Sequence, residues 1–399
     1  MLAALTRILG LHNLALAEDV VQDVLVRALE AWKYAGPPRD ASAWLRTAAR
    51  NRAIDLIRRE RTRRAFAPDL ELQSEYALTP NVSAMFAESE IEDDLLRMMF
   101  SVCAPHLAEP AQLALVLKLL CGFGTREIAA ALLSSEAAVE KLLTRGKETL
   151  ARAGALFEVA GREQIEKRLE AVQHALYLLF SEGYHGSGEV VQEELCAEAM
   201  RLCGLLAQHP ACAVPRTLAL LSLMCFHAAR LPGRAAADGS LVLLEEQDRS
   251  RWDRGLIARG FELLDASATG DELSEYHLEA AISSLHCAAP SVEDTDWEQI
   301  IRLYELLYEQ RPSPMVAMGR AVAVGEARGP VAGLQALQLI AGEPKLASFP
   351  FLPAAMARLL LRAGRTEEAA RYFAEAIRKA RNPAEAKLFK SLQSQSRKK

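Results

Sequence analysis

Apolar side chains recur at the spacing of an α-helix along nearly the whole chain of 399 residues. Separations of three, four and seven residues dominate, whereas alternating runs of β-branched residues, which would indicate strands, are few. Alanine and leucine predominate among the apolar residues, which make up 51% of the chain. A chain of this length forms two or three domains with sizeable cores. The sequence therefore predicts an all-α protein.

Two predicted helices near the start of the chain differ sharply in charge. The first reads NLALAEDVVQDVLVRALEAW and begins after Asn13, a residue type that caps helix N-termini. The second reads SAWLRTAARNRAIDLIRRERTRR, with Ser42 as its expected cap. Between Arg46 and Arg64, eight arginines accompany two acidic residues, a local charge of +6 in a chain whose net charge is −5. A helix this basic in a mildly acidic chain indicates a polyanionic partner.

The next segment has the opposite composition. Residues 65–94 contain eight acidic residues and no lysine or arginine, together with two prolines. Low hydrophobicity and uncompensated charge favour an extended linker over a packed element.

A helix-turn-helix pattern follows this linker. Helices are expected over Ile91–Cys103 and Pro110–Cys121, followed by the turn GFGT. Thr125 is the expected cap of a short helix, and Ser135 is the expected cap of a longer helix with basic residues on its outer side. A short helix, a tight turn and a longer helix with exposed cations are typical of DNA-binding modules.

The rest of the chain is predicted to be helical. The segment ARLLLRAGRTEEAARYFAEAIRKARNP places small and aromatic residues at the intervals of a tetratricopeptide repeat. These residues are Ala357, Gly364, Ala369, Phe373 and Ala376. An earlier segment, SPMVAMGRAVAVGEARGPVAGLQALQLI, is interpreted as a degenerate partner repeat. One clear repeat does not support a long regular solenoid.

Several other classes of protein are excluded by the sequence. No uncharged apolar run reaches 18 residues and no secretory signal pattern is present, so we expect a cytoplasmic protein without a membrane span. The seven cysteines are scattered in helical surroundings, which favours reduced, buried thiols. The spacings of Cys196, Cys203, His209 and Cys212 do not match a zinc site. We expect no metal, no cofactor, no catalytic residues and no enzymatic activity.

Several motifs together resemble one known family, the bacterial sigma-70 family of transcription initiation factors. Region 2.2 of that family is similar to AEDVVQDVLVRALEAW, regions 2.3 and 2.4 to AWLRTAARNRAIDLIRR, and region 4.2 to TREIAAALLSSEAAVEKLLTRGKETL. The arrangement resembles the extracytoplasmic-function type, which keeps only regions 2 and 4. A subgroup with a C-terminal tetratricopeptide-like extension has segments similar to YLLFSEGYHGS, EEQDRSRWDRGLIARGFELL, DWEQIIRLYELL and SPMVAMGRAVAV.

The resemblance implies a division of the chain into four parts. Sigma region 2 is expected over residues 1–66, the acidic linker over 67–94, the helix-turn-helix of region 4 over 95–156, and a helical domain over 163–399 with its repeat near 350–383. Region 2 usually begins with a longer helix, whereas only MLAALTRIL precedes the first loop here. We therefore expect either a start site assigned too far downstream or a shortened first helix.

The resemblance also implies two partners, core RNA polymerase and promoter DNA, and a set of residues for each. The polymerase is expected to contact Asp19, Gln22 and Asp23. The −10 promoter element is expected to contact Trp44, Arg46, Arg50, Asn51, Arg52, Arg58 and Arg59. The −35 element is expected to contact Thr125, Ser135, Glu136, Lys141, Thr144, Arg145 and Lys147.

The residues also have simpler interpretations. Trp44 is interpreted as a core residue when it is considered alone, and a charged helix face is commonly a solvated surface. The turn carries Leu133 and Ser134 where glycine is frequent in related modules, and the second helix carries Glu140 where a basic residue is common. Both departures predict weak duplex binding by region 4 alone.

Alternative functions remain open at this point. A stand-alone helix-turn-helix regulator with a helical-repeat sensor would leave the pair of helices over 13–64 unexplained. A helical scaffold or small-molecule enzyme lacks any nucleophile–base pair or phosphate loop in the sequence. For the C-terminal domain we hypothesise regulation of regions 2 and 4 within the chain, or the binding of a peptide or small ligand.

Overall fold

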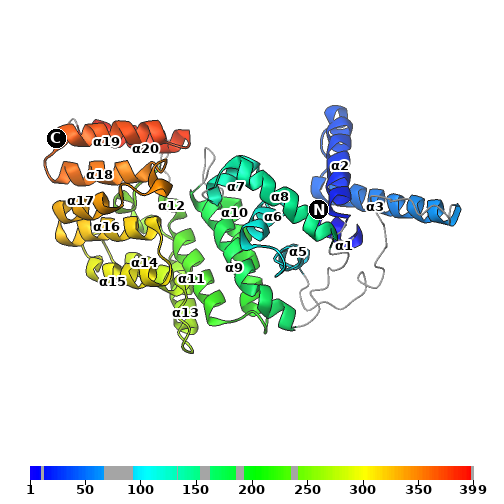
Figure 1. The fold of residues 1–399 in the computed structure, drawn as a ribbon, viewed down its shortest axis with the longest axis horizontal. Coiled ribbons are helices and arrows are strands. Elements are labelled where there is room, and N and C mark those ends of the chain that lie inside the picture. Colours follow the sequence, from blue (N-terminus) through cyan, green and yellow to red (C-terminus); the bar gives the residue numbers. More distant parts are fainter. Residues whose placement is uncertain are drawn as a thin grey trace. The chain divides into compact units, whose positions relative to one another are not determined.

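The computed structural model describes residues 1–9, 13–66, 93–132, 134–152, 162–185, 193–234 and 241–396. Within these ranges the regular elements are α-helices and short 3-10 helices, which confirms the all-α fold (Figure 1). None of these helices combines the length and the apolar character needed to cross a bilayer. The chain divides into two compact units, Met1–Ala175 and Leu176–Lys399.

The α-helices of the first unit are α1 (Leu2–Leu9), α2 (Leu14–Ala35), α3 (Ala41–Phe66), α5 (Asp94–Val102), α6 (Glu109–Leu119), α7 (Thr125–Ala131), α8 (Glu136–Arg152) and the start of α9 (Arg162–His185). Those of the second unit are the end of α9, α10 (Glu193–Gln208), α11 (Pro215–Ala229), α12 (Leu231–Arg234), α13 (Arg254–Ser267), α14 (Glu275–Ala288), α15 (Trp297–Gln310), α16 (Pro314–Arg328), α17 (Pro330–Ile340), α18 (Phe351–Arg362), α19 (Thr366–Lys379) and α20 (Pro383–Ser396). The 3-10 helices are η2 (Leu244–Glu246), η3 (Arg249–Arg251) and η4 (Pro344–Leu346).

Helices α1, α2 and α3 share one small apolar core. Its buried members are Leu5, Leu9, Ala17, Val20, Val24, Ala49 and Ala53. Alanines in α2 and α3 allow the two helix backbones to approach closely. The short first helix therefore supplies leucines to this core, and the charged residues of α2 and α3 are left on its outside.

Asn13 lies at the N-cap position of α2, as predicted, whereas the predicted Ser42 cap of α3 was wrong. The Asn13 side chain makes no cap hydrogen bond; its Nδ2 donates to the Leu9 carbonyl oxygen at 2.8 Å. Helix α3 begins at Ala41, and Asp40 Oδ1 accepts a hydrogen bond from the Ala43 amide at 2.8 Å. Asp40 therefore satisfies one of the backbone amides that have no partner within the helix at its start. Ser42 lies inside the helix. Hydrogen bonds from Ala43 and Ser42 lower the pKa of Asp40.

The helix-turn-helix pattern is present as α7 followed by α8. The Ser135 hydroxyl accepts a hydrogen bond from the Ala138 amide at 3.3 Å, which confirms the predicted cap of α8. Thr125 was expected to cap α7 but is its first helical residue. The Glu127 carboxylate instead accepts a hydrogen bond from the Gly124 amide at 2.6 Å. Residues 67–92 of the predicted acidic linker, which was expected over 67–94, lie outside the described residues, and its last two residues are the cap and first residue of α5.

In the second unit, α11 packs against α10, α13 and α14. Its side chains are buried along most of its length. The prediction of buried thiols is confirmed for six cysteines, and Cys121 in the first unit is half-buried. Burial raises the pKa of Cys103 and of Cys196 to about 12.

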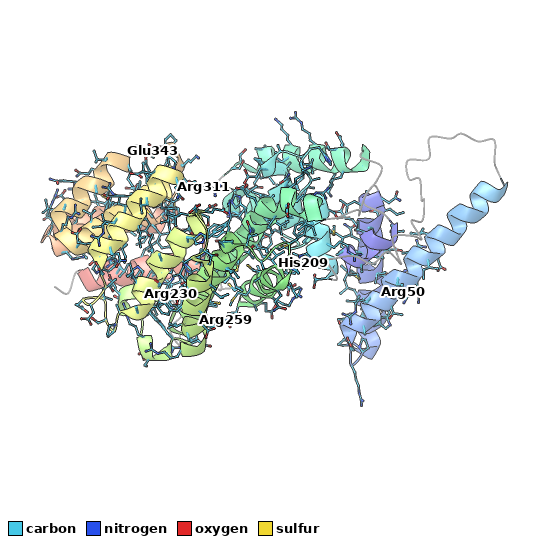
Figure 2. The ribbon with its side chains drawn as sticks, turned by 90° about the horizontal axis from the view of Figure 1, so that it is seen from below. Arg50, His209, Arg230, Arg259, Arg311 and Glu343 are labelled. Carbon is cyan, nitrogen blue, oxygen red and sulfur yellow. The ribbon has the colours of Figure 1, made fainter. Side chains whose placement is uncertain are left out.

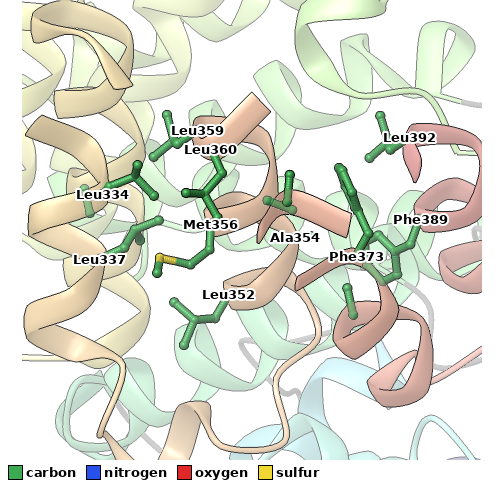
Figure 3. Packing of buried hydrophobic residues seen from close by; sticks show 14 of the residues in the cluster. Leu334, Leu337, Leu352, Ala354, Met356, Leu359, Leu360, Phe373, Phe389 and Leu392 are labelled. Carbon is green, nitrogen blue, oxygen red and sulfur yellow. The ribbon is translucent and has the colours of Figure 1, made fainter. Parts of the chain in front are cut away.

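The end of the chain is a series of helical hairpins (Figure 1). Helices α16 and α17 approach so closely that a Cβ at Gly333 would lie 2.6 Å from the Gly325 Cα. Figure 3 shows the core that α17 and α18 share with α19 and α20, where Met356, Phe373 and Phe389 are buried. Ala357, Ala369 and Ala376 are fully buried, and Gly364 adopts a positive φ of 76° between α18 and α19. The assignment of this hairpin as tetratricopeptide-like stays a prediction.

Candidate nucleic-acid interface

Helix α3 presents an exposed basic face. Arg46, Arg50 and Asn51 are exposed, and Figure 2 shows Arg50 on the outside of this helix. The neighbouring face of the helix is anchored in the core by the buried Ala49 and Ala53. Arg58 and Arg59 lie further along α3, but their side chains are outside the described residues. The described part of the face therefore offers two guanidinium groups and one amide to solvent.

Arg52 occupies a different environment from these exposed arginines. Its Nε donates to Asp23 Oδ2 at 3.1 Å, and the side chain is half-buried between α3 and α2. Asp23 also lies 3.5 Å from Arg27 Nη2 on its own helix. The structure thus pairs an arginine predicted to contact DNA with an aspartate predicted to contact polymerase. The contact joins the two helices and leaves both predicted roles untested.

Trp44 lies against the core of the first three helices. Its ring packs edge-on against Trp32, with ring centroids 5.5 Å apart. The indole is only partly buried, so one part of it stays open to solvent near the start of α3. This placement fits the core interpretation, while the open part keeps stacking on a base sterically feasible.

Helix α2 carries an exposed apolar stripe that the sequence interpretation missed. Leu25, Val26 and Leu29 have exposed fractions of 43%, 54% and 72%. Asp19 and Gln22 are exposed on the same side of the helix. The sequence signal for this surface was a group of apolar residues outside the buried stripe. An isolated surface leucine needs no explanation, but three adjacent apolar residues indicate an interaction surface. We call Asp19, Gln22, Leu25, Val26 and Leu29 the α2 face.

Helix α8 has an outer side of mixed charge. Glu136, Lys141, Thr144 and Arg145 are exposed, as is Glu140. The Thr144 hydroxyl donates to the Glu140 carbonyl oxygen of its own helix at 2.9 Å. The cations on this helix are therefore accompanied by carboxylates, which reduces its attraction for phosphate.

Lys147 is engaged within the first unit. Its Nζ donates to both carboxylate oxygens of Glu18 on α2, at 2.7 and 2.9 Å. The two side chains are about one-third and one-quarter exposed, at 34% and 24%. This ion pair connects the predicted −35-binding helix to the helix predicted to bind polymerase.

No group of three or more His, Cys, Asp or Glu side chains suited to a metal occurs in the part of the chain that the structure describes. The site is therefore a surface made of helix faces: one basic, one apolar with acidic flanks, and one of mixed charge.

Comparison with known proteins identifies relatives for most of the chain. Residues 1–63 match the family described as Sigma-70 region 2, and residues 97–150 match Sigma-70, region 4. Residues 168–268 match a family of unknown function, DUF6596. The chain is 38% identical over 378 residues to a protein of Rhizobium meliloti (strain 1021) named "Uncharacterized protein R00370", which covers 94% of this chain and 88% of that protein. No solved structure matches the chain significantly.

Proposed function

Because the chain belongs to the sigma-70 family of RNA polymerase sigma factors, we propose that it binds core RNA polymerase and directs it to promoters. In this proposal α3 grips the −10 element, α8 contacts the −35 element, and the protein helps to open the DNA. Sigma factor families are not enzymes, so the proposed activity is recognition and strand separation without a catalytic group.

The exposed basic face of α3 is the observation on which the proposal depends most. Arg46 and Arg50 are exposed to solvent, so they are available to neutralise phosphates. Asn51, the residue after Arg50, is also exposed and is able to hydrogen-bond a base edge. Separated strands expose both phosphates and unstacked bases, and the half-open Trp44 lies at the start of this helix.

The α2 face supports the polymerase part of the proposal. A surface with apolar residues at its centre and acidic or amide residues at its edge resembles the usual arrangement of a protein–protein interface. Its carboxylate at Asp19 would pair with arginine on the partner. Burial of the exposed apolar area would stabilise the complex in addition to charge pairing.

The ion pair between Lys147 and Glu18 indicates a rearrangement on promoter binding. The −10 and −35 elements lie about 25 base pairs apart, which is about 85 Å at 3.4 Å per base pair. Helices α2 and α8 joined by an ion pair of 2.7 Å do not span that distance. In our proposal region 4 separates from region 2 when the polymerase positions both, and the partly exposed pair costs at most about 1 kcal/mol to break.

We also assign the finer features to this function. The chain is an extracytoplasmic-function sigma factor, its acidic linker occupies the polymerase channel where nucleic acid later passes, and its tetratricopeptide-like C-terminal domain regulates regions 2 and 4. The match of residues 168–268 to a family of unknown function is consistent with a specialised extension.

Run-off transcription with purified core polymerase tests the proposal. Genomic promoter fragments, beginning with the region upstream of the protein's own gene, should yield defined transcripts only when both components are present. Duplex binding without polymerase, combined with absence of these transcripts and of core association, would instead identify a stand-alone helix-turn-helix regulator.

A further inference from the structure

The boundary between the two compact units lies inside one helix. Helix α9 runs from Arg162 to His185, and the first unit ends within it, at Ala175 (Figure 1). Ala175 and Leu176, on either side of the boundary, are both fully buried. Compact units are usually joined by an exposed linker rich in glycine, proline or polar residues. A buried helix differs from such a linker because it transmits a movement that a flexible segment would absorb.

The sequence of α9 keeps the helix unbroken across this boundary. Residues 162–182 contain neither glycine nor proline, the residues at which helices most often kink. Gly183 comes only near the end of the helix, where the backbone lies close to α10. A Cβ at Gly183 would lie 2.9 Å from the backbone nitrogen of Cys196. We therefore expect the two halves of α9 to move together.

The first half of α9 is anchored on the first two helices of region 4. Arg168 Nη1 donates a hydrogen bond to the carbonyl oxygen of Phe100, in α5, at 3.0 Å. His174 Nδ1 lies 2.7 Å from Oε1 of Glu109, the first residue of α6. Leu169, between these two anchors, is buried. Helix α9 therefore holds both α5 and α6.

Helix α6 connects these anchors to the predicted recognition helix. It packs against α8. The two helices are so close that a Cβ at Gly146 would lie 2.8 Å from Leu115 Cδ1. Gly146 stands between Arg145 and Lys147, which are both expected to contact the −35 element. A movement of α6 would therefore reach the side chains with which α8 is expected to contact DNA.

The second half of α9 is held by other helices of the second unit. The Cys196 thiol, in α10, donates a hydrogen bond to the Phe180 carbonyl oxygen at 3.7 Å. The Tyr184 ring packs edge-on against His227 of α11, with ring centroids 4.9 Å apart. The guanidinium carbon of Arg234, in α12, lies 4.0 Å from the centroid of the same tyrosine ring, a cation–π distance. A change in the packing around Tyr184 would therefore act directly on α9.

We propose that α9 transmits conformational changes of the second unit to region 4. A shift of its second half against α10, α11 and α12 moves its first half on α5 and α6, and α6 in turn displaces α8. The effect on promoters rests on the regulatory role proposed above for the C-terminal domain, with region 4 as the part that is regulated. The coupling itself is a property of the folded chain, so its test requires neither DNA nor polymerase.

Hydrogen–deuterium exchange of the full chain, followed by mass spectrometry of its peptides, measures this coupling. Tyr184→Ala removes the ring that contacts His227 and Arg234. Exchange in α5 and α6 should become about fivefold faster or more, because coupling between sites typically changes equilibria by at least this factor. Phe389→Ala is the matched control, since it removes a buried aromatic ring from α20. It should raise exchange in α18, α19 and α20 and leave α5 and α6 unchanged.

Two further variants complete the test, and circular dichroism verifies that each variant is folded. Arg234→Gln removes only the cation above the Tyr184 ring, so it serves if Tyr184→Ala unfolds the second unit, and it should accelerate exchange in the same helices. Because coupling is reciprocal, Arg168→Gln should raise exchange in α10 and α11.

Two results would overturn the proposal. One is unchanged exchange in α5 and α6 for the folded Tyr184 and Arg234 variants. The other is an equal acceleration there for Phe389→Ala, which would indicate a general loosening of the chain. A failure to associate with core polymerase would contradict the proposed function and would leave these exchange rates as they are.

Discussion

At the scale of single residues, charge and exposure distinguish arginines that look alike in the sequence. Arg46, Arg50 and Arg52 all lie within two turns of α3, but only Arg52 is paired with Asp23. The sequence predicts the arginine-rich helix because local spacing determines its faces. It does not predict the pairing, because Asp23 is 29 residues away and the contact depends on how two helices pack.

Replacing Arg50 by alanine should weaken promoter binding by the holoenzyme. If Arg50 neutralises one phosphate, the slope of log K against log salt should become shallower by about 0.9 on duplex or about 0.7 on separated strands. Filter binding or fluorescence titration at several salt concentrations measures this slope. Arg259→Ala, which removes an exposed arginine of α13, is the control and should leave the slope unchanged. An identical slope for Arg50→Ala would contradict a phosphate contact.

Glu279 should make stability depend on pH in an unusual direction. Burial raises the pKa of this carboxyl in the folded protein to about 7, from an ordinary value of 4.5, so the folded state holds the proton more tightly than the unfolded state. The free energy of unfolding should therefore fall as pH rises from about 4.5 to about 7, and then level off. Denaturant titrations should show Glu279→Gln gaining roughly 1–2 kcal/mol over the wild type across this range, after allowance for partial exposure. If the free energies of unfolding of the two proteins changed with pH in parallel, the raised pKa of Glu279 would be refuted.

At the scale of helices, periodicity predicts where elements lie, and their ends depend on competition between neighbouring polar groups. Helix α8 was predicted together with its Ser135 cap, because one hydroxyl stands before one apolar stripe. For α3, both Asp40 and Ser42 are suitable cap residues, and the Asp40 carboxylate accepts the cap hydrogen bond. The exposed apolar stripe of α2 was not predicted, because helical spacing identifies the buried face of a helix and gives no role to the apolar residues outside that face.

Leu29→Asp should weaken the association with core polymerase about tenfold or more. The side chain is 72% exposed, so the substitution adds charge to the α2 face without disturbing the core. Leu339→Asp, on the exposed side of α17 with 88% exposure, is the matched control. Affinity measured by surface capture of core polymerase should fall for Leu29→Asp alone. Equal affinities for both variants would remove the α2 face from the interface.

Gly146→Ala should destabilise the helix-turn-helix by about 1–2 kcal/mol. A Cβ at this position would lie 2.8 Å from Cδ1 of the buried Leu115, so either this side chain would have to shift within the core or α8 and α6 would have to separate. The cost of overpacking, about 1–3 kcal/mol, exceeds the gain of up to about 1 kcal/mol from alanine in a helix. Gly204→Ala in α10 meets no atom within 4 Å and should be neutral or stabilising. Thermal melts of both variants decide the question, and a stabilised Gly146→Ala would show that the helices have room.

At the scale of the whole molecule, the sequence predicts the class of fold and the order of helices but not the sites formed by distant segments. The rings of Tyr177 of α9 and Tyr276 of α14 lie with centroids 5.5 Å apart, although no local pattern relates these two residues to each other. The ion pair between Lys147 and Glu18 crosses 129 residues for the same reason. Tertiary packing creates both contacts, so neither could be predicted from the sequence.

Truncation tests whether the second unit regulates the first. The chain should be cut after Ala175, where the first compact unit ends, because Arg168 of α9 donates a hydrogen bond to the Phe100 carbonyl oxygen at 3.0 Å and belongs to that unit. We expect the truncated protein to give a promoter output at least twofold different from the full chain in run-off transcription. Circular dichroism verifies that the remaining unit is folded, and an unchanged output would refute regulation by the second unit.

The burial of the thiols determines how this protein reacts with oxidants and electrophiles. Six of its seven thiols are buried. Burial raises the pKa of five of them, so at neutral pH these five present almost no thiolate to peroxide or maleimide. Cys121, just after α6 and beside the turn that leads to α7, is the thiol that such reagents reach first. Oxidation and chemical labelling of the thiols would therefore both begin next to the helix-turn-helix of α7 and α8.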